Sequence, residues 1–256
     1  MYAEERQQAI ASLTRERGRV AVADLAQRFS VTSETVRRDL DALAQSGVIE
    51  RVHGGAIPSG RLRLGELDLI HREDAQREAK MRIAQVALGA IPRRRDVTIM
   101  LDGGTTTARL ADLLTPDVVG TVVTNSVAIA ATLAGRGINA VHQLGGRVRG
   151  VTQTAVGAVT VEALNALHVD IAFVGANGFS ARHGLSTPDP SEAAVKTAMV
   201  RAGTRSIALV DSSKANDDQL VRFAELSDID VLITDTGLSA DDRSALSDQE
   251  VEVVLA

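Results

Sequence analysis

The chain has 256 residues, of which 45% are hydrophobic and 24% are charged, and its formal net charge is −5. That is the composition of an ordinary globular protein, long enough for one large domain or for a small domain and a medium one. The absence of cysteine excludes disulfides and Cys-ligated metal sites, and the five histidines lack metal-site spacing, so we expect neither metal nor cofactor. No apolar signal segment follows the charged N-terminus and no apolar run has membrane length, so we expect a cytoplasmic protein.

The charged residues are unevenly distributed along the chain. Residues 1–72 carry 11 Lys and Arg against 10 Asp and Glu, whereas the remainder carries 17 against 23. An acidic body repels DNA. Any contact with DNA must therefore come from a local face of the first part.

Three helical patterns open the chain. The first covers residues 4–17, the second covers 22–29, and the third follows Thr32, which we expect to be its N-cap. Apolar residues recur at helical spacing in the third pattern and should face a core: Val36, Leu40 and Leu43. Gly47 is expected to end this helix. The polar residues of its first turns then point away from the core: Ser33, Glu34, Thr35, Arg37 and Arg38.

Only a few residues separate the second and third helices, as in a helix-turn-helix, whose second helix enters the major groove of DNA. Polar and Arg side chains near the start of that helix suit base edges and phosphates. Residues 48–57, VIERVHGGAI, then alternate apolar and polar positions and turn at Gly54-Gly55, which predicts a β-hairpin. The alternative is a small helical bundle whose adjacent arginines are solvated surface charges.

Residues 2–57 closely resemble the DNA-binding domain of DeoR-type bacterial transcription regulators. The strings that carry the resemblance most clearly are TVRRDL at 35–40 and RVHGGA at 51–56. The resemblance implies a winged helix-turn-helix over residues 1–57 that binds double-stranded operator DNA. It assigns DNA contacts to Thr32, Ser33, Glu34, Thr35, Arg37 and Arg38 on the helix, and to Arg51 and His53 on the hairpin.

Residues 58–74 are predicted to be a linker, because they begin with Pro58-Ser59-Gly60 and have mixed character. Residues 75–91 predict an amphipathic helix that ends before Pro92. The run Arg93-Arg94-Arg95 is expected to be a solvated turn rather than a second DNA contact.

The rest of the chain alternates apolar runs with helical patterns. Continuous Val- and Ile-rich runs joined by helices predict an α/β fold, in which a mostly parallel sheet is covered on both faces. The expected strands are 97–101, 119–124, 140–144, 171–174, 206–210, 231–234 and 251–255. The expected helices between them are 106–114, 127–134, 155–167, 192–202 and 240–247.

In such sheets ligands bind at the carboxyl ends of the strands, so the loops that follow the strands are candidate binding loops. Five of these loops are polar or rich in glycine: 102–107, 124–126, 145–146, 175–178 and 211–214. Glycine lets backbone N–H groups approach a ligand, a helix N-terminus favours an anion, and hydroxyls and a lysine donate to phosphate oxygens. The pattern therefore predicts a site for an anionic ligand.

This half also resembles the sensor domain of DeoR-type regulators, through LDGGTT, TNS, LGG, DIAFVGANGFSARHGLSTPDPSEAAVK and IALVDSSK. That domain is similar in fold to ribose-5-phosphate isomerase and CoA-transferases, and the family uses it to bind phosphorylated sugars or related metabolites. The resemblance implies a sensor domain over residues 75–256, with phosphate held by Gly103, Gly104, Thr105, Thr106 and Thr107. Asp102, Asn125, Asn177 and Lys214 would line the sugar. The effector-binding set is completed by Thr124, Gly145, Gly146, Gly175 and Gly178.

Two further residues of this half, Glu192 and Lys196, lie one helical turn apart. Residues at this spacing are neighbours on a helix surface, where opposite charges attract. We therefore expect them to form an ion pair on the helix surface.

Catalysis on a sugar phosphate would need a base that removes a carbon-bound proton. The isomerases that this domain resembles carry acids in a Gly-Ala-Asp-Glu stretch, where this chain has the amide and glycine of 175–178, GANG. Asp102 and Glu192 remain as candidate bases, and Glu162, the nearest candidate for a CoA-transferase nucleophile, has no supporting motif. We expect a sensor without catalytic residues.

The sequence favours a transcription regulator, specifically a repressor of sugar uptake or catabolism genes that acts as a homodimer or homotetramer. We expect its effector to be a hexose phosphate such as fructose 1-phosphate or fructose 6-phosphate. Two alternatives stay open: a sugar-phosphate isomerase-like enzyme with an appended DNA-binding head, and a second domain that serves only for oligomerisation.

Overall fold

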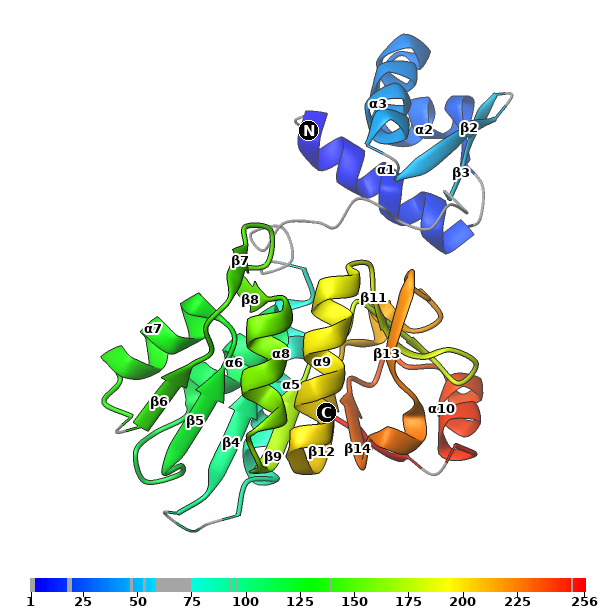
Figure 1. The fold of residues 1–256 in the computed structure, drawn as a ribbon. Coiled ribbons are helices and arrows are strands. Elements are labelled where there is room, and N and C mark those ends of the chain that lie inside the picture. Colours follow the sequence, from blue (N-terminus) through cyan, green and yellow to red (C-terminus); the bar gives the residue numbers. More distant parts are fainter. Residues whose placement is uncertain are drawn as a thin grey trace. The chain divides into compact units, whose positions relative to one another are not determined.

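The computed structural model describes residues 3–17, 20–46, 48–52, 54–58, 75–92, 94, 96–138, 140–249 and 251–256. The chain divides into two compact units, Met1–Glu66 and Leu67–Ala256, each with its own hydrophobic core (Figure 1). The predicted linker lies almost entirely outside the described residues, and Gly47 and His53 also lie outside them.

The described part of the smaller unit contains three helices and a three-stranded antiparallel sheet. They are α1 (Ala3–Arg17), β1 (Val20–Ala21), α2 (Val22–Phe29), α3 (Ser33–Gln45), β2 (Ile49–Val52) and β3 (Gly55–Pro58). The sheet has the order β1-β3-β2, and Gly55 permits the approach of β3 to β1, because a Cβ atom there would lie 1.9 Å from the Val20 carbonyl oxygen. The α2–α3 pair and the β2–β3 hairpin confirm the predicted winged helix-turn-helix.

The core of this unit combines apolar side chains with one buried ion pair. Apolar side chains from helices and strands meet at Ile10, Leu25, Val36, Leu40 and Ile49. Beside them the guanidinium of Arg6 in α1 donates to Asp39 in α3 at 2.5 and 3.2 Å, and Gln7 donates to the same carboxylate at 3.1 Å. Asp39 therefore faces the core and fixes α3 against α1, whereas its neighbours Arg37 and Arg38 are exposed.

A seven-stranded parallel sheet forms the centre of the larger unit (Figure 1). In spatial order its strands are β15 (Glu252–Leu255), β14 (Val231–Thr234), β12 (Gly203–Leu209), β9 (Val169–Val174), β4 (Thr98–Leu101), β5 (Thr121–Thr124) and β6 (Ala140–Gln143). Each corresponds to one of the predicted strands, so the predicted parallel α/β architecture is confirmed.

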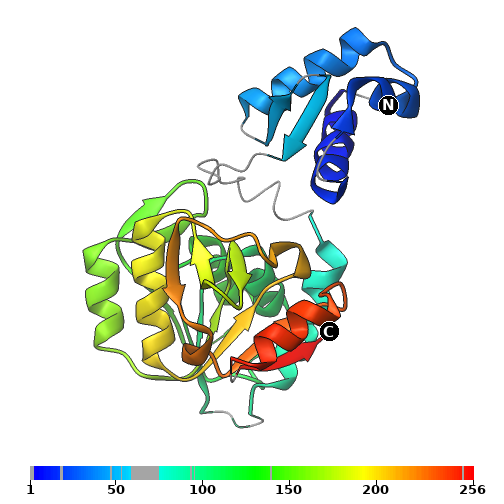
Figure 2. The ribbon, with the colours of Figure 1, turned by 90° about the vertical axis from the view of Figure 1, so that its right-hand side faces the viewer.

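Helices cover both faces of this sheet. They are α5 (Arg77–Gly89), α6 (Thr105–Leu113), α7 (Val127–Gly135), α8 (Ala158–Asn165), α9 (Pro190–Ala202) and α10 (Ala240–Ser247). In β4, Ile99 packs with α5, α6 and α7, whereas its neighbour Met100 packs with α8 and α9, so both faces are apolar. Figure 2 shows α8 and α9 side by side on one face of the sheet. In the described ranges no helix combines the length and apolar character needed to cross a membrane.

Short antiparallel strands were missed by the sequence analysis. They are β7 (Arg147–Arg149), β8 (Thr154–Val156), β10 (Gly178–Ser180), β11 (Gly184–Thr187) and β13 (Val221–Ala224). The predicted helix 155–167 is wrong at its start, because its first two residues belong to β8. Gly157, at a φ of +103°, separates that strand from α8.

Candidate functional site

The first candidate site is the exposed face of α3. Thr32 is the N-cap, and its hydroxyl accepts a hydrogen bond from the Thr35 backbone N–H at 3.2 Å. The side chains of Arg37 and Arg38 are 57% and 81% exposed, and each lies beside the Glu34 carboxylate, at 3.6 and 3.8 Å. Ser33 is exposed at the start of the same helix. The predicted DNA-contacting residues of α3 therefore share one solvent-facing surface.

The hairpin contributes Arg51 to this surface. One nitrogen of its guanidinium donates to the Arg37 carbonyl oxygen at 3.1 Å and lies 3.2 Å from the Asp41 carboxylate. Arg51 thus connects β2 to α3 and sets the position of the hairpin relative to the recognition helix. Direct contact between this side chain and DNA stays a prediction, and so does that of His53.

The Thr32 cap leads to a first testable prediction. Thr32→Ala should destabilise the first turn of α3 by about 1 kcal/mol, because the Thr35 N–H loses its acceptor. Hydrogen exchange of the α3 amides should then be about fivefold faster, since 1.4 kcal/mol corresponds to about tenfold in an equilibrium constant. The matched control is Ser33→Ala, one residue along the same exposed turn. Equal exchange in the two variants would contradict the capping role.

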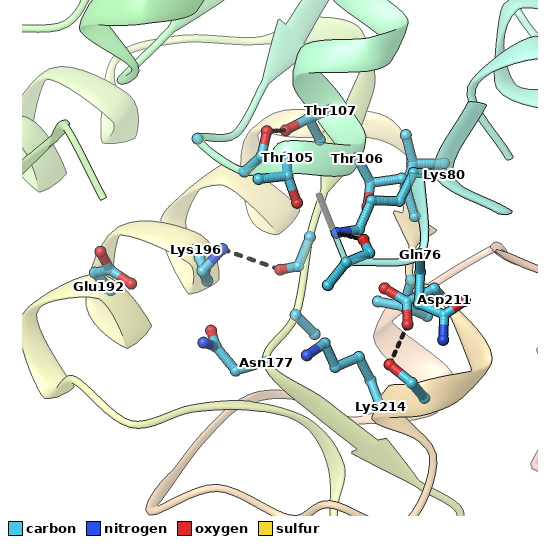
Figure 3. Close-up of a pocket in the computed structure, with 18 residues that line it drawn as sticks. Gln76, Lys80, Thr105, Thr106, Thr107, Asn177, Glu192, Lys196, Asp211 and Lys214 are labelled. Atoms are coloured by element: carbon cyan, nitrogen blue, oxygen red, sulfur yellow. Dashed lines mark hydrogen bonds between the residues drawn. The ribbon is translucent and has the colours of Figure 1, made fainter. Parts of the chain in front are cut away.

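The second candidate site is a pocket at the carboxyl ends of β4, β9 and β12 (Figure 3). Eight of the predicted effector-binding residues line it: Gly103, Gly104, Thr105, Thr106, Thr107, Gly175, Asn177 and Lys214. The other lining residues are Ala75, Gln76, Lys80, Ala176, Glu192, Lys196, Leu209, Val210, Asp211 and Ser213. The structure therefore brings three of the five predicted loops together around one cavity.

The remaining predicted residues do not line this pocket. Asn125 accepts a hydrogen bond from the Gly103 N–H at 3.0 Å, and Thr124 accepts one from the Ser126 N–H at 3.1 Å. Gly146 lies against Thr160, and Gly178 lies against the backbone of Asp217. The other two members of this group are Asp102, which is buried, and Gly145, which is exposed. Asn125 thus holds the start of the loop 103–107 from outside the pocket, whereas Thr124 stabilises its own loop at 124–126.

The N-terminus of α6 forms part of the pocket wall. The N-cap Gly104 has no side chain to satisfy the first amides of the helix. Thr107 directs its hydroxyl to the Gly104 carbonyl oxygen at 2.9 Å, which stabilises the turn. Uncapped amides at the positive end of the helix dipole form a site for an anion. This arrangement fits a phosphate group better than a neutral ligand.

Asp102 and Lys196 form a buried ion pair at the pocket, where Lys196 is one of the lining residues. The Lys196 ammonium donates to the Asp102 carboxylate and, at 3.0 Å, to the Gly175 carbonyl oxygen. The Gly175 N–H donates back to Asp102 at 3.0 Å. Burial raises the pKa of the Asp102 carboxyl above its ordinary value, against the lowering effect of Lys196 and the Gly175 N–H.

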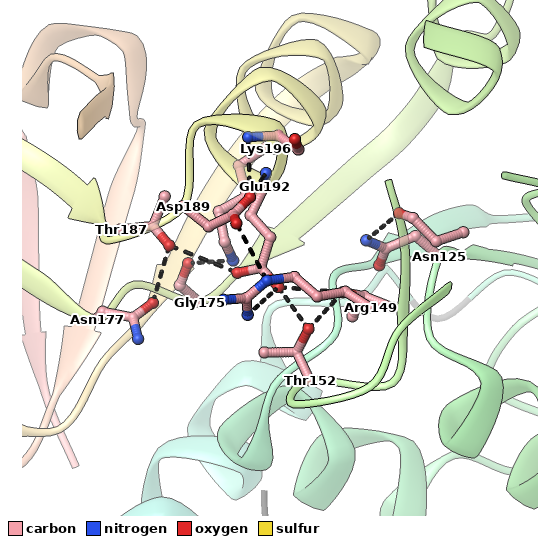
Figure 4. A network of polar contacts seen from close by, with 12 residues as sticks. Asn125, Arg149, Thr152, Gly175, Asn177, Thr187, Asp189, Glu192 and Lys196 are labelled. Carbon is pink, nitrogen blue, oxygen red and sulfur yellow. Dashed lines mark hydrogen bonds and ion pairs between the residues drawn. The ribbon is translucent and has the colours of Figure 1, made fainter. Parts of the chain in front are cut away.

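Glu192 lies in a separate polar network (Figure 4). Its carboxylate accepts hydrogen bonds from the hydroxyls of Thr152 and Thr154, the latter at 3.2 Å, and lies 3.3 Å from the Arg149 guanidinium. The predicted surface ion pair between Glu192 and Lys196 is therefore wrong. Both residues are buried, and each is bonded to partners from other elements of the fold.

Gln76 and Lys80 were missed by the sequence analysis. Both come from the start of α5, where the Lys80 ammonium donates to the Ala75 carbonyl oxygen at 2.6 Å. The one signal in the sequence is a lysine next to Ala79 and three residues before Ile83, on a stripe that is otherwise apolar. A buried lysine there is explained by its place in the pocket wall, where it adds to the positive charge of Lys214.

Both units match known protein families. The chain matches the DeoR-like helix-turn-helix domain over residues 6–59 and the DeoR C terminal sensor domain over residues 75–236. The HTH-type transcriptional regulator YulB of Bacillus subtilis is 33% identical over 253 residues, covering 99% of this chain and 96% of that protein. The lactose phosphotransferase system repressor of Streptococcus mutans is 32% identical over 237 residues, covering 92% and 93%.

Solved structures are more distant. Ribose 5 phosphate isomerase A from Neisseria gonorrhoeae is 17% identical, with 55% of this chain and 54% of that chain covered and a TM-score of 0.41. A likeness of this size carries no argument about the chemistry of the pocket.

Proposed function

The chain belongs to the DeoR family of helix-turn-helix transcriptional regulators, and from this premise we propose that it represses sugar-metabolism genes in the cytoplasm in response to a phosphorylated sugar. The α3 face would read a double-stranded operator. A hexose phosphate such as fructose 1-phosphate or fructose 6-phosphate would bind in the pocket and change the affinity for that operator. The name of the Streptococcus mutans relative, a repressor of a sugar phosphotransferase system, supports this assignment.

The observation that carries the ligand proposal is the uncapped N-terminus of α6, which lies in the pocket wall together with Lys80 and Lys214. Backbone amides and two ammonium groups would neutralise a phosphate. Asn177 and Asp211 offer polar groups to sugar hydroxyls farther along the same cavity (Figure 3). The two binding events are linked. If the effector changes the affinity of the protein for its operator by some factor, then bound operator changes the affinity of the protein for the effector by the same factor.

The test is a fluorescence anisotropy titration of DNA from beside the protein's own gene, repeated with a panel of sugar phosphates. Fructose 1-phosphate and fructose 6-phosphate should shift the operator affinity, whereas unphosphorylated fructose should not. Isothermal calorimetry with the same panel measures binding directly. If no sugar phosphate produces heat, the pocket is no sensor site and the second domain serves for oligomerisation alone.

Thr106 offers a sharper test of the phosphate site. Thr106→Val removes a buried hydroxyl from the pocket wall and keeps its shape, so the affinity for the sugar phosphate should fall about 10- to 150-fold, the equivalent of about 1.5–3 kcal/mol. Operator affinity without ligand should not change. The matched control is Thr115→Val, an exposed position beyond the other end of α6. Unchanged ligand affinity in Thr106→Val would mean that the phosphate is held elsewhere.

A sugar-phosphate isomerase-like enzyme is the second candidate, because the carboxylate of Glu192 lines the pocket. That carboxylate already accepts hydrogen bonds from threonine hydroxyls, and the carboxylate of Asp102 is bonded to Lys196. These contacts support a binding role over proton abstraction. Turnover of ribose 5-phosphate by the purified protein would favour the enzyme instead.

A further inference from the structure

The two oxygens of the Glu192 carboxylate have different surroundings (Figure 4). Oε1 accepts hydrogen bonds from the hydroxyls of Thr152 and Thr154 and from the guanidinium of Arg149. Oε2 lies 3.5 Å from the Thr187 hydroxyl, and the described part of the chain gives it no other partner. One oxygen is therefore fully bonded, and the other has almost no donor.

Thr187 does not supply the donor that Oε2 lacks. A hydroxyl has a single proton, and the Asn177 side-chain oxygen lies nearer to that hydroxyl, at 3.2 Å. A separation of 3.5 Å is also longer than an ordinary O–H···O hydrogen bond. Glu192 is only 5% exposed, so solvent reaches little of it, and a buried polar atom without a partner is costly. A donor from a bound molecule would remove that cost.

The under-bonded oxygen belongs to the pocket. The three partners of Oε1 are not among the described residues that line the pocket, whereas Glu192 itself and Asn177 are. In Figure 3, Glu192 lies on the left of the pocket, and Thr106 and Lys80 of the proposed phosphate site lie on the right. The free acceptor is therefore at the end of the pocket away from the phosphate.

The charged groups bonded to one another at this end carry a net negative charge. Arg149 lies 3.2 Å from the Asp189 carboxylate and 3.3 Å from that of Glu192, and Lys196 is paired with Asp102. In this cluster of described residues, three carboxylates face two cations. A ligand hydroxyl is neutral and can donate its proton here, whereas a second anionic group would be repelled.

We infer that Glu192 determines which phosphorylated molecules the pocket accepts. Its Oε2 takes a hydrogen bond from a sugar hydroxyl at the end opposite the phosphate, and its charge rejects ligands that carry a second anionic group there. A site built to bond a hydroxyl discriminates against an analogue without it, because the polar group of the protein is then left unpaired. The ligand class is thus a sugar monophosphate with a free terminal hydroxyl. This inference rests on the proposed function, which places the phosphate at the other end of the pocket.

The first experiment is isothermal calorimetry of the wild-type full chain with three probes that differ at one position of the sugar. They are fructose 6-phosphate, 1-deoxyfructose 6-phosphate and fructose 1,6-bisphosphate. Loss of the terminal hydroxyl should weaken binding about 10- to 150-fold, as for other hydrogen bonds to a charged group. A second phosphate in its place should weaken binding at least about 100-fold, because it meets a like charge.

The second experiment repeats the titrations with Glu192→Gln, which keeps the shape of the side chain and removes its charge. Affinity for fructose 6-phosphate should fall about tenfold, whereas affinity for fructose 1,6-bisphosphate should rise about tenfold, since the like charge is gone. A purely structural role of Glu192 would lower both affinities together. The matched control is Glu252→Gln, which removes the charge of an exposed glutamate in β15 and should change neither affinity.

The outcomes separate this inference from the proposed function. Equal affinity of the wild type for fructose 6-phosphate and the bisphosphate, or a Glu192→Gln protein that loses affinity for both, would overturn the inference, while the pocket would remain a sugar-phosphate site. A wild type that does not bind fructose 6-phosphate would overturn the proposed ligand and this inference with it. The wild-type comparison needs no variant, so it decides the question even if Glu192→Gln does not fold.

Discussion

Lys196→Met should lower the free energy of unfolding of the larger unit by about 3–5 kcal/mol. This is the usual cost of removing one partner of a buried ion pair, because the other charge stays buried without a counter-charge. The Asp102 carboxylate would keep the Gly175 N–H as a donor but lose the only ammonium that the described structure bonds to it. Urea unfolding followed by circular dichroism measures the loss. Arg201→Met is the control, because Arg201 is an exposed basic residue of the same helix as Lys196.

The pH dependence of this variant follows from the pKa of Asp102. A carboxyl whose pKa is raised by folding binds protons more readily in the folded state than in the unfolded state. Its contribution to the free energy of unfolding is therefore complete when the pH is below 3.8, the ordinary pKa of Asp, and is lost as the pH rises through the folded-state pKa. Removing Lys196 raises that pKa further. The stability deficit of Lys196→Met relative to the wild type should therefore shrink as the pH falls toward about 4.

Removing both charges should restore most of the lost stability. Asp102→Asn/Lys196→Met leaves no buried ion, and replacing a buried pair by neutral groups is often close to neutral. A double variant as unstable as Lys196→Met alone would show that other contacts of the lysine side chain dominate, among them that of its ammonium nitrogen, which lies 5.5 Å from the Phe223 ring centre.

Arg38→Ala should weaken operator binding about 5- to 150-fold, because a good arginine contact with a base edge is worth about 1–3 kcal/mol. Folding should be unaffected, since the side chain is 81% exposed and its pairing with Glu34 at 3.8 Å is a surface contact. Arg37→Ala should behave similarly. Anisotropy titrations of operator and unrelated DNA measure both affinities, and Arg243→Ala, an exposed arginine of the other unit, is the control.

The salt dependence of binding distinguishes two roles for these arginines. Loss of a phosphate contact should weaken binding to all sequences and reduce the slope of log affinity against log salt by about 1. Loss of a base contact should lower the preference for operator while the slope changes less. Unaltered affinity in both variants would mean that α3 is not the recognition helix.

The central sheet could be predicted from the sequence because its strands are buried on both faces. β9 and β14 are nearly continuous runs of apolar residues, and such runs need no knowledge of their partners. β10 and β11 could not be found in this way. They are short and begin with Gly178 and Gly184, so they have too few apolar positions to show a period. β11 also pairs with β13, which is distant in the chain: Leu185 lies opposite Ala224.

The same limit applies to the pocket. The loop 103–107 could be found because glycine and threonine between a strand and a helix are a local pattern. Lys80 belongs to the pocket through the packing of α5 against α6, which the sequence does not reveal. The interpretation of Glu192 and Lys196 as a surface pair followed the local spacing rule, and it failed because burial gave each residue a stronger partner elsewhere in the fold.

The walls of the pocket come from both layers of helices around the sheet: α6 lies on one face and α9 on the other, and each contributes lining residues. A molecule bound there would bridge two layers that otherwise meet through the strands. At about 100 times its dissociation constant it would add about 2.7 kcal/mol to the stability of the folded state. Scarcity of the metabolite would then make the protein easier to degrade, so the cell's supply of sugar would set the abundance of the regulator as well as its activity.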